Sequence, residues 1–283
     1  MGKAWLYPPP LDRLFTFGDA EFGTQKEMPD YVGQLGLAQE HVPALVEIVR
    51  MWEDEDSLPD SPADSAPIHA WRALGQLRAI EAVEPLLAMQ NRLAEERDDW
   101  YLGEFQEVFG QVGPPAIPAL AAYLANTLNG EFPRISAADG LLQIAKRHPE
   151  SRDEVVGVLG RQIAQCEEGV YDMNGFLVSH LVELKATESA EAIERAFAAQ
   201  VVEDDVCGTW GRVRQDLGVA GLGLAPDTPP RPKIKMPRPE QLLGDPPIVF
   251  IGDDRNRQRA ADKKAKAKRK QQEKARKRNR KRR

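Results

Sequence analysis

The sequence predicts an all-α fold, a right-handed α-solenoid of about five helix pairs followed by a disordered basic C-terminal tail. Three observations lead to this prediction. Apolar residues recur at the spacing of one helix face, a two-helix motif is repeated along the chain, and the segment from residue 253 onward is almost entirely polar and basic.

The clearest copy of the motif runs from Ile68 to Leu87. Trp71, Leu74 and Leu77 follow Ile68 at regular intervals and share one helix face. Residues 78–80 then form a turn, and a proline falls within the first turns of the second helix, where its missing N–H costs little. Helices this short are unstable alone, so we expect Leu74 and Leu77 to be buried between neighbouring helices.

Weaker copies of the motif give five units with loops of variable length, which is typical of stacked helix pairs. Successive anchor residues, which lie near the end of each first helix, are 42, 35, 33 and 40 residues apart. Five units exceed the roughly three that are needed to bury a continuous core. The predicted units span 29–52, 65–95, 99–127, 132–166 and 170–200, with the anchors Gly33, Gly75, Gly110, Gln143 and Glu183.

These units resemble HEAT repeats, and in particular the short HEAT-like repeats of the phycobilisome lyase group. The resemblance is carried by the motifs PPPLDRLFTFGDAEF, DYVGQLGLAQEHVPALV, APIHAWRALGQL and IERAFAAQVVEDDVCGTWGRVRQDLGV. From about Pro8 to Val219 the chain is similar to an uncharacterised bacterial family of HEAT-like proteins. The resemblance implies the repeat fold and no particular activity, because the lyase name follows the shape of the repeat.

Composition divides the chain into four segments. An apolar lead-in precedes the repeats and is expected to cover the open end of the first unit. The repeat domain follows, and then a stretch dense in proline and glycine that is expected to be a linker. The segments are the lead-in 1–28, the repeat domain with its C-terminal cap 29–219, the linker 220–252 and the basic tail 253–283.

Some local features of the repeat domain can also be predicted. The helix that contains Trp210 is expected to close the far end of the stack. Ser65 and Asn174 are suited to cap the first helices of the second and fifth units. The acidic loop between Glu53 and Ser65 lacks a calcium-loop pattern, so we expect it to be solvated.

Charge is divided unevenly along the chain. Residues 253–283 hold 17 of the 38 basic and 4 of the 44 acidic residues, a net charge of +13, which leaves 21 basic and 40 acidic residues, or −19, in the preceding 252. The tail has no apolar residue larger than alanine, so it is not expected to fold alone. The predicted polyanion-binding residues are Arg255, Arg257, Arg259, Lys263, Lys264, Lys266, Lys268, Arg269, Lys270, Lys274, Arg276, Lys277, Arg278, Arg280, Lys281, Arg282 and Arg283.

Such a tail has several candidate partners. Its cation density favours the phosphate backbone of RNA, DNA or the ribosome, which is bound through counterion release. An acidic protein and the chain's own acidic body are the competing partners. A membrane surface is not predicted, because the tail has no apolar face.

The sequence contains no recognisable catalytic or metal-binding pattern. None of the four histidines lies near a cysteine at metal-ligand spacing, and the HExxH, CxxC and phosphate-loop motifs are missing. Cys166 and His180 are expected to meet as a buried pair without catalytic work. His69 and Arg72 are expected to face a loop. We therefore predict no enzymatic activity and no cofactor.

A cytoplasmic location is predicted. The two cysteines are too few for a disulfide scaffold, and the N-terminus has no secretory signal. No stretch approaches the roughly 18 uninterrupted apolar residues that would cross a membrane.

The predicted function is that of a non-enzymatic interaction scaffold, in which the superhelix binds a protein partner and the tail binds a polyanion. Exposed residues on the second helices, namely Glu47, Arg50, Gln90 and Arg161, are the predicted protein-binding residues. The alternative is a bilin lyase-like chromophore maturation factor, which follows only from the resemblance. The sequence predicts neither the identity of the partner nor the oligomeric state.

Overall fold

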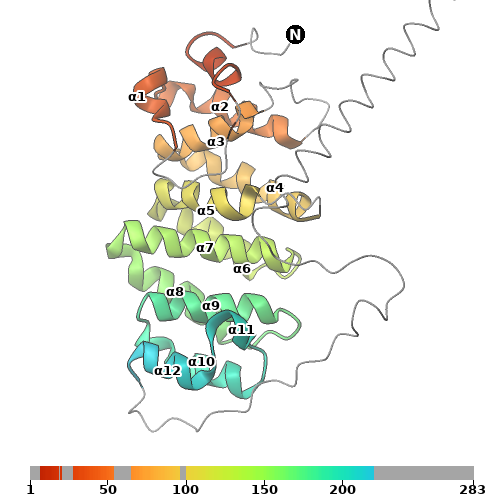
Figure 1. Cartoon of the computed structure of the whole chain (residues 1–283), viewed down its shortest axis with the longest axis vertical. Helices are drawn as coiled ribbons and strands as arrows, with labels where there is room; N and C mark the ends of the chain where they lie inside the picture. Colours follow the sequence, from red (N-terminus) through yellow and green to blue (C-terminus); the bar gives the residue numbers. More distant parts are fainter. Residues whose placement is uncertain (1–6, 19, 21–27, 54–64, 96–99, 220–283) are drawn as a thin grey trace, which may run out of the picture. The chain divides into compact units, whose positions relative to one another are not determined.

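The structure is a computed structural model that describes residues 7–18, 20, 28–53, 65–95 and 100–219. All regular elements within these ranges are helices, so the predicted all-α class is confirmed (Figure 1). They belong to the first of two compact units, residues 1–231, whereas the second unit, 232–283, lies outside the described residues together with the predicted tail.

Two helices occupy each of the five predicted repeat spans, and a short 3₁₀ turn stands directly before the second helix of each pair. The first helices are α1 Tyr31–Leu35, α3 Ala66–Gln76, α5 Trp100–Val112, α7 Glu131–Arg147 and α9 Tyr171–Glu183. The second helices are α2 Val42–Arg50, α4 Val83–Glu95, α6 Ile117–Ala125, α8 Arg152–Ile163 and α10 Ala190–Ala198. The chain then continues into α11 Asp204–Cys207 and α12 Trp210–Leu217.

Like helices pack on like helices in chain order. Helix α3 contacts α1 and α5, α7 contacts α5 and α9, and the second helices follow the same succession from α2 to α10 (Figure 1). This packing buries the apolar stripe of each helix, as the sequence pattern requires. Leu74 is fully buried and Leu77 is 9% exposed, so the predicted burial of both leucines is confirmed.

Aromatic side chains link the first three units at the centre of this core. The ring centroids of Trp52 and Trp71 are 5.6 Å apart, and those of Trp71 and Phe105 are 5.2 Å apart. Both pairs meet edge to face, the arrangement that the quadrupoles of aromatic rings favour.

Polar side chains fasten the first unit to the second, the fourth to the fifth, and the fifth to the segment that follows it. In each case a side chain bonds a main-chain atom near a helix end, over distances of 2.7 to 3.0 Å. Helix ends leave main-chain donors and acceptors unpaired, so these bonds replace local caps. They run from Gln39 to Leu77 O, Gln76 to Pro29 O, Arg92 to Trp52 O, Arg152 to Leu184 O and Asn174 to Val201 O, and from Met173 N to Glu131.

The same use of side chains between units explains two wrong predictions. Asn174 does not cap α9, since it lies inside that helix, is fully buried, and donates from Nδ2 to Val201 O. Ser65 occupies the N-cap position of α3 but forms no capping bond, and its Oγ instead accepts from Ala20 N at 3.0 Å.

The segments before and after the five pairs pack against the first units and against the last unit. The short 3₁₀ helix Leu11–Phe15 contacts α3, and Leu14 and Phe15 are buried. At the other end Trp210 is 2% exposed, and its ring lies 5.7 Å from that of Phe197 on α10.

Within the described ranges, no single helix is both long and apolar enough to cross a membrane. One bent pair, Gly103–Val112 with Pro114–Ala125, passes the same test only when its two helices, 113° apart, are taken together.

Candidate functional site

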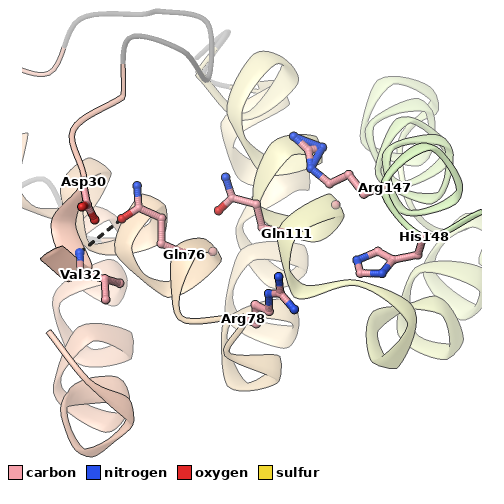
Figure 2. A pocket seen from close by; sticks show the side chains of 9 residues that line it. Asp30, Val32, Gln76, Arg78, Gln111, Arg147 and His148 are labelled. Atoms are coloured by element: carbon pink, nitrogen blue, oxygen red, sulfur yellow. Dashed lines mark hydrogen bonds between the residues drawn. The ribbon is translucent and has the colours of Figure 1, made fainter.

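One concavity in the described residues is a groove where the first helices of successive units end (Figure 2). It encloses about 480 Å³ and lies open to solvent. It is formed at the start of α1 and at the C-terminal ends of α3, α5 and α7. The lining residues are Asp30, Val32, Gly75, Gln76, Arg78, Gly110, Gln111, Arg147 and His148.

The turn after α3 places Arg78 in this groove. Arg78 adopts a left-handed conformation with φ of 53°, its N–H donates to Gly75 O, and the N–H of Ala79 donates to Leu74 O. These two bonds form the Schellman ending of a helix, in which the left-handed residue is usually glycine. An arginine here makes the turn energetically less favourable than a glycine would, and its side chain is exposed.

Glycines form the floor of the groove. A Cβ atom on Gly75 would lie 2.4 Å from Oε1 of Gln111, and one on Gly110 would lie 2.8 Å from Cβ of Gln143. Both distances are shorter than any normal contact between such atoms. The glycines in the repeated motif therefore allow each first helix to lie close to the next one.

Basic side chains gather in the part of the groove away from Asp30. Figure 2 shows Arg78, Arg147 and His148, which come from two different turns, directed toward the same space. Arg147 also forms an ion pair with Glu107 on α5, which fixes its guanidinium between α5 and α7. At the other end lies Asp30, the N-cap residue of α1. Its carboxylate accepts a hydrogen bond from the N–H of Gly33 at 2.7 Å.

Two glutamines at equivalent places have different surroundings. Both amide atoms of Gln76 form hydrogen bonds, because its Oε1 accepts from Tyr31 N at 2.8 Å and its Nε2 donates to Pro29 O. Gln111 lies one unit further along. Its Oε1 is shielded from solvent and accepts no hydrogen bond from any residue that the structure describes. Burying an acceptor without a donor costs about 1–3 kcal/mol.

A second group of polar side chains is buried between α1, α3 and α5, the helices that carry them. Tyr31 Oη and His69 Nδ1 are 2.7 Å apart, while Trp71 Nε1 and Arg72 Nε both donate to Oε2 of Glu104, at 3.1 and 2.8 Å. None of the five side chains is more than 4% exposed. Burial raises the pKa of Tyr31 and lowers the pKa of His69. This cluster therefore joins the first three units.

This cluster corrects the prediction for His69 and Arg72, which were expected to face a loop. Both side chains are buried, because the neighbouring helices α1 and α5 provide partners for them. The prediction holds for His69 to the extent that its Nε2 lies 3.0 Å from the carbonyl oxygen of Gly18 in the loop before α1. The predicted pairing of Cys166 with His180 is also wrong, since Nε2 of His180 lies 2.8 Å from a carboxylate oxygen of Asp139 on α7.

Three of the four predicted protein-binding residues, Glu47, Arg50 and Arg161, are exposed on second helices. Gln90 is not, so this prediction was wrong. Its side chain is fully buried because α4 is covered by α2, α5, α6 and α7. None of these four residues lines the groove. The predicted polyanion-binding residues, Arg255 to Arg283, lie outside the described residues.

Sequence reasoning assigned Arg78 to a turn and assigned none of Arg78, Arg147 and His148 to a site. One signal was present in the sequence, because two basic turns follow first helices of the repeat, at 78 and at 147–148. The stacking of the units brings these turns to one groove.

Comparison of the chain with protein-family models, with curated proteins and with solved structures finds no significant match. The resemblance to HEAT-like repeats thus stays a prediction from the sequence motifs.

Proposed function

We propose that this chain is a HEAT-like α-solenoid that acts as a non-enzymatic interaction scaffold, binding a protein partner through its groove and a polyanion through its tail. The observation that carries the proposal is the groove itself, which continues over four successive first helices. A surface built by repetition in this way suits an extended partner better than a compact one.

The packing of the helices supports the solenoid arrangement. First helices contact first helices and second helices contact second helices in chain order. Most of the side chains that fasten helix ends join one unit to the next, from Gln39 on Leu77 to Arg152 on Leu184. Each repeat of an α-solenoid likewise gains most of its stability from its immediate neighbours.

The lining of the groove favours a polypeptide over an enclosed chromophore. Val32 is the single apolar side chain among the nine lining residues, and the groove is open to solvent. Sites that hold a small organic ligand are mostly apolar and bury most of its surface. Bilin binding, the alternative drawn from the resemblance, therefore has less support than protein binding.

The tail supports the second half of the proposal through its charge alone. Its net charge of +13 stands beside a net charge of −19 in the preceding residues. A body with this negative charge repels phosphate, so the tail is the segment that would bind nucleic acid.

A pull-down experiment with full-length proteins tests both halves. Three chains are compared: the natural chain, Arg78→Glu, and a tail-neutral chain in which every Lys and Arg of 253–283 is replaced by Gln. We expect Arg78→Glu to lose protein partners that survive nuclease treatment. We expect the tail-neutral chain to lose the nuclease-sensitive material only.

Two results would count against this proposal. If the natural chain and Arg78→Glu retain the same nuclease-resistant partners, the groove is not the binding surface. If the tail-neutral chain retains its nucleic acid, the tail is not the polyanion-binding segment. An absorbance shift on incubation with bilins would instead favour the maturation-factor alternative.

A further inference from the structure

We propose that the groove binds an extended acidic peptide segment, with its acidic side chain held at the end formed by Arg78, Arg147 and His148. This proposal rests on the proposed scaffold function and adds the chemistry of the partner. The preceding 252 residues hold 21 basic and 40 acidic residues, so the gathering of basic side chains in one groove runs against the composition. Charge of this sign inside an acidic surface selects for an acidic ligand.

Arg78 is available for such a ligand. Its side chain is exposed and forms no ion pair with any residue in the described ranges. The Schellman turn fixes its backbone, because two main-chain hydrogen bonds close around it. A guanidinium can bind a carboxylate through two parallel N–H bonds, which gives both strength and orientation.

The neighbouring turn holds the other two basic groups in place. Arg147 donates to Glu107 and to Gln143, so its position is fixed without a ligand. The ring of His148 lies against Gly113, where an added Cβ would come within 2.7 Å of its Nε2. This glycine has φ of 85° and leaves room for the imidazole at the edge of the groove. Arg147 and His148 each lie beside a carboxylate, that of Glu107 and that of Glu150, so Arg78 carries the charge that no acidic side chain of the described residues balances. These side chains are in place before the ligand arrives, which lowers the entropic cost of binding.

Between the two ends, the groove suits a peptide backbone. The side-chain oxygen of Gln111 is shielded from solvent and has no donor in the described part of the chain. This oxygen packs against Gly75, so the Gln111 side chain must rotate to present it to the groove. A main-chain N–H of a peptide would then satisfy it, whereas a phosphate backbone carries no such donor. This is why a peptide is proposed and nucleic acid is left as an outcome of the test.

The span of the groove sets the length of the segment. It touches α1, α3, α5 and α7, which pack in succession. Neighbouring helix axes lie about 8–10 Å apart, so the groove spans roughly 25–30 Å. At about 3.3 Å per residue, an extended segment of about eight residues fills it. Asp30 at the far end favours a basic residue or an amino terminus there.

A peptide-display selection tests the proposal even though the partner is unidentified. The bait is the full-length tail-neutral chain, so the tail cannot capture acidic peptides. A library of random peptides of about this length is selected on three baits: the tail-neutral chain, the same chain with Arg78→Glu, and the same chain with Arg195→Glu. Arg195 is an exposed arginine on α10 and serves as the control for the change in net charge.

We expect peptides selected on the first and third baits to be enriched in Asp and Glu at one position. On the Arg78→Glu bait we expect that enrichment to vanish or to change to Lys and Arg. A selected peptide should lose at least about tenfold in affinity on Arg78→Glu, as removal of a charged hydrogen-bonding partner predicts. On Arg195→Glu its affinity should change by less than about twofold, as expected for a distant surface charge. Equal urea midpoints for the three chains show that folding is unchanged.

Three outcomes would overturn the proposal: no selected peptides, peptides without acidic enrichment, or enrichment that persists on Arg78→Glu. A single-stranded RNA that binds the tail-neutral chain in an Arg78-dependent way, in place of peptides, would assign the groove to nucleic acid. A negative result in this selection would not by itself refute the scaffold function. A partner that is still captured in the pull-down, through Glu47 or Arg50 for example, would leave the scaffold function standing.

Discussion

Replacing Gly110 with alanine tests how closely the units are packed. An added Cβ would lie 2.8 Å from Cβ of Gln143 on α7 and 3.1 Å from Nη1 of Arg147. Carbon atoms normally approach to about 3.5–4.0 Å, so the gap must open by roughly 0.7–1.2 Å. The Cβ of Gln143 is attached directly to the backbone and cannot move away by side-chain rotation. Helices α5 and α7 must therefore separate.

The magnitude follows from two opposing effects. Overpacking of this kind costs about 1–3 kcal/mol. Alanine in place of glycine gains up to about 1 kcal/mol in helix propensity, and less here, because Gly110 is close to the end of α5 at Val112. We expect Gly110→Ala to lower the free energy of unfolding by about 1–2 kcal/mol.

Gly157 on α8 provides the matched control. A Cβ there would meet only Nη1 of Arg161, at 3.4 Å, and that flexible side chain can move aside. Gly157→Ala should raise the free energy of unfolding by about 0.5–1 kcal/mol. The assay is urea unfolding of each full-length chain followed by far-ultraviolet circular dichroism, with midpoints compared at equal slopes. If Gly110→Ala is as stable as Gly157→Ala, the close approach of α5 and α7 is refuted.

Four further predictions concern the core, the buried polar groups and the tail. Leu74→Ala should cost about 2–5 kcal/mol in urea unfolding and Leu77→Ala less, since Leu77 keeps slight exposure; a loss under about 0.5 kcal/mol at Leu74 would contradict the packing. Burial lowers the pKa of His69, so the unfolded chain takes up a proton first as the pH falls below about 6.5, and stability should drop in that range. The drop should be smaller in His69→Gln, and equal drops would refute it. Gln90→Met should stabilise the chain by about 1 kcal/mol, because neither amide atom of Gln90 has a hydrogen-bond partner within the described ranges; a loss in thermal melting would argue against this. With roughly eight cations of 253–283 engaged, log K for duplex DNA should fall with log salt at a slope near −7 in filter binding, and the tail-neutral chain should show no such binding.

The periodicity of apolar residues was enough to predict the helix pairs, the turn at 78–80 and the buried positions of Trp71 and Leu74. This succeeded because an α-helix must turn its apolar face toward its neighbours, whichever neighbours those are. The anchor glycines Gly33, Gly75 and Gly110 were recognised as repeat markers in the same way. The physical role of Gly75 and Gly110, a close approach of one unit to the next, required the distance from each of these two glycines to the following helix.

Polar residues were where sequence reasoning failed, and the reason is the same at each of them. Gln90, His69 and Arg72 were assigned to the surface because their side chains are polar, yet each lies under helices that are distant in sequence. Whether a polar side chain is exposed depends on which helices cover it and on whether a partner such as Glu104 stands opposite.

The sequence by itself thus determined the helical class, the positions of the helix pairs and the charge of the tail, because these depend on local pattern and composition. Only the tertiary structure decided which polar groups are buried and which basic turns meet. Arg78 lies 69 residues before Arg147 in the chain, and the stacking of α3, α5 and α7 places both in one groove.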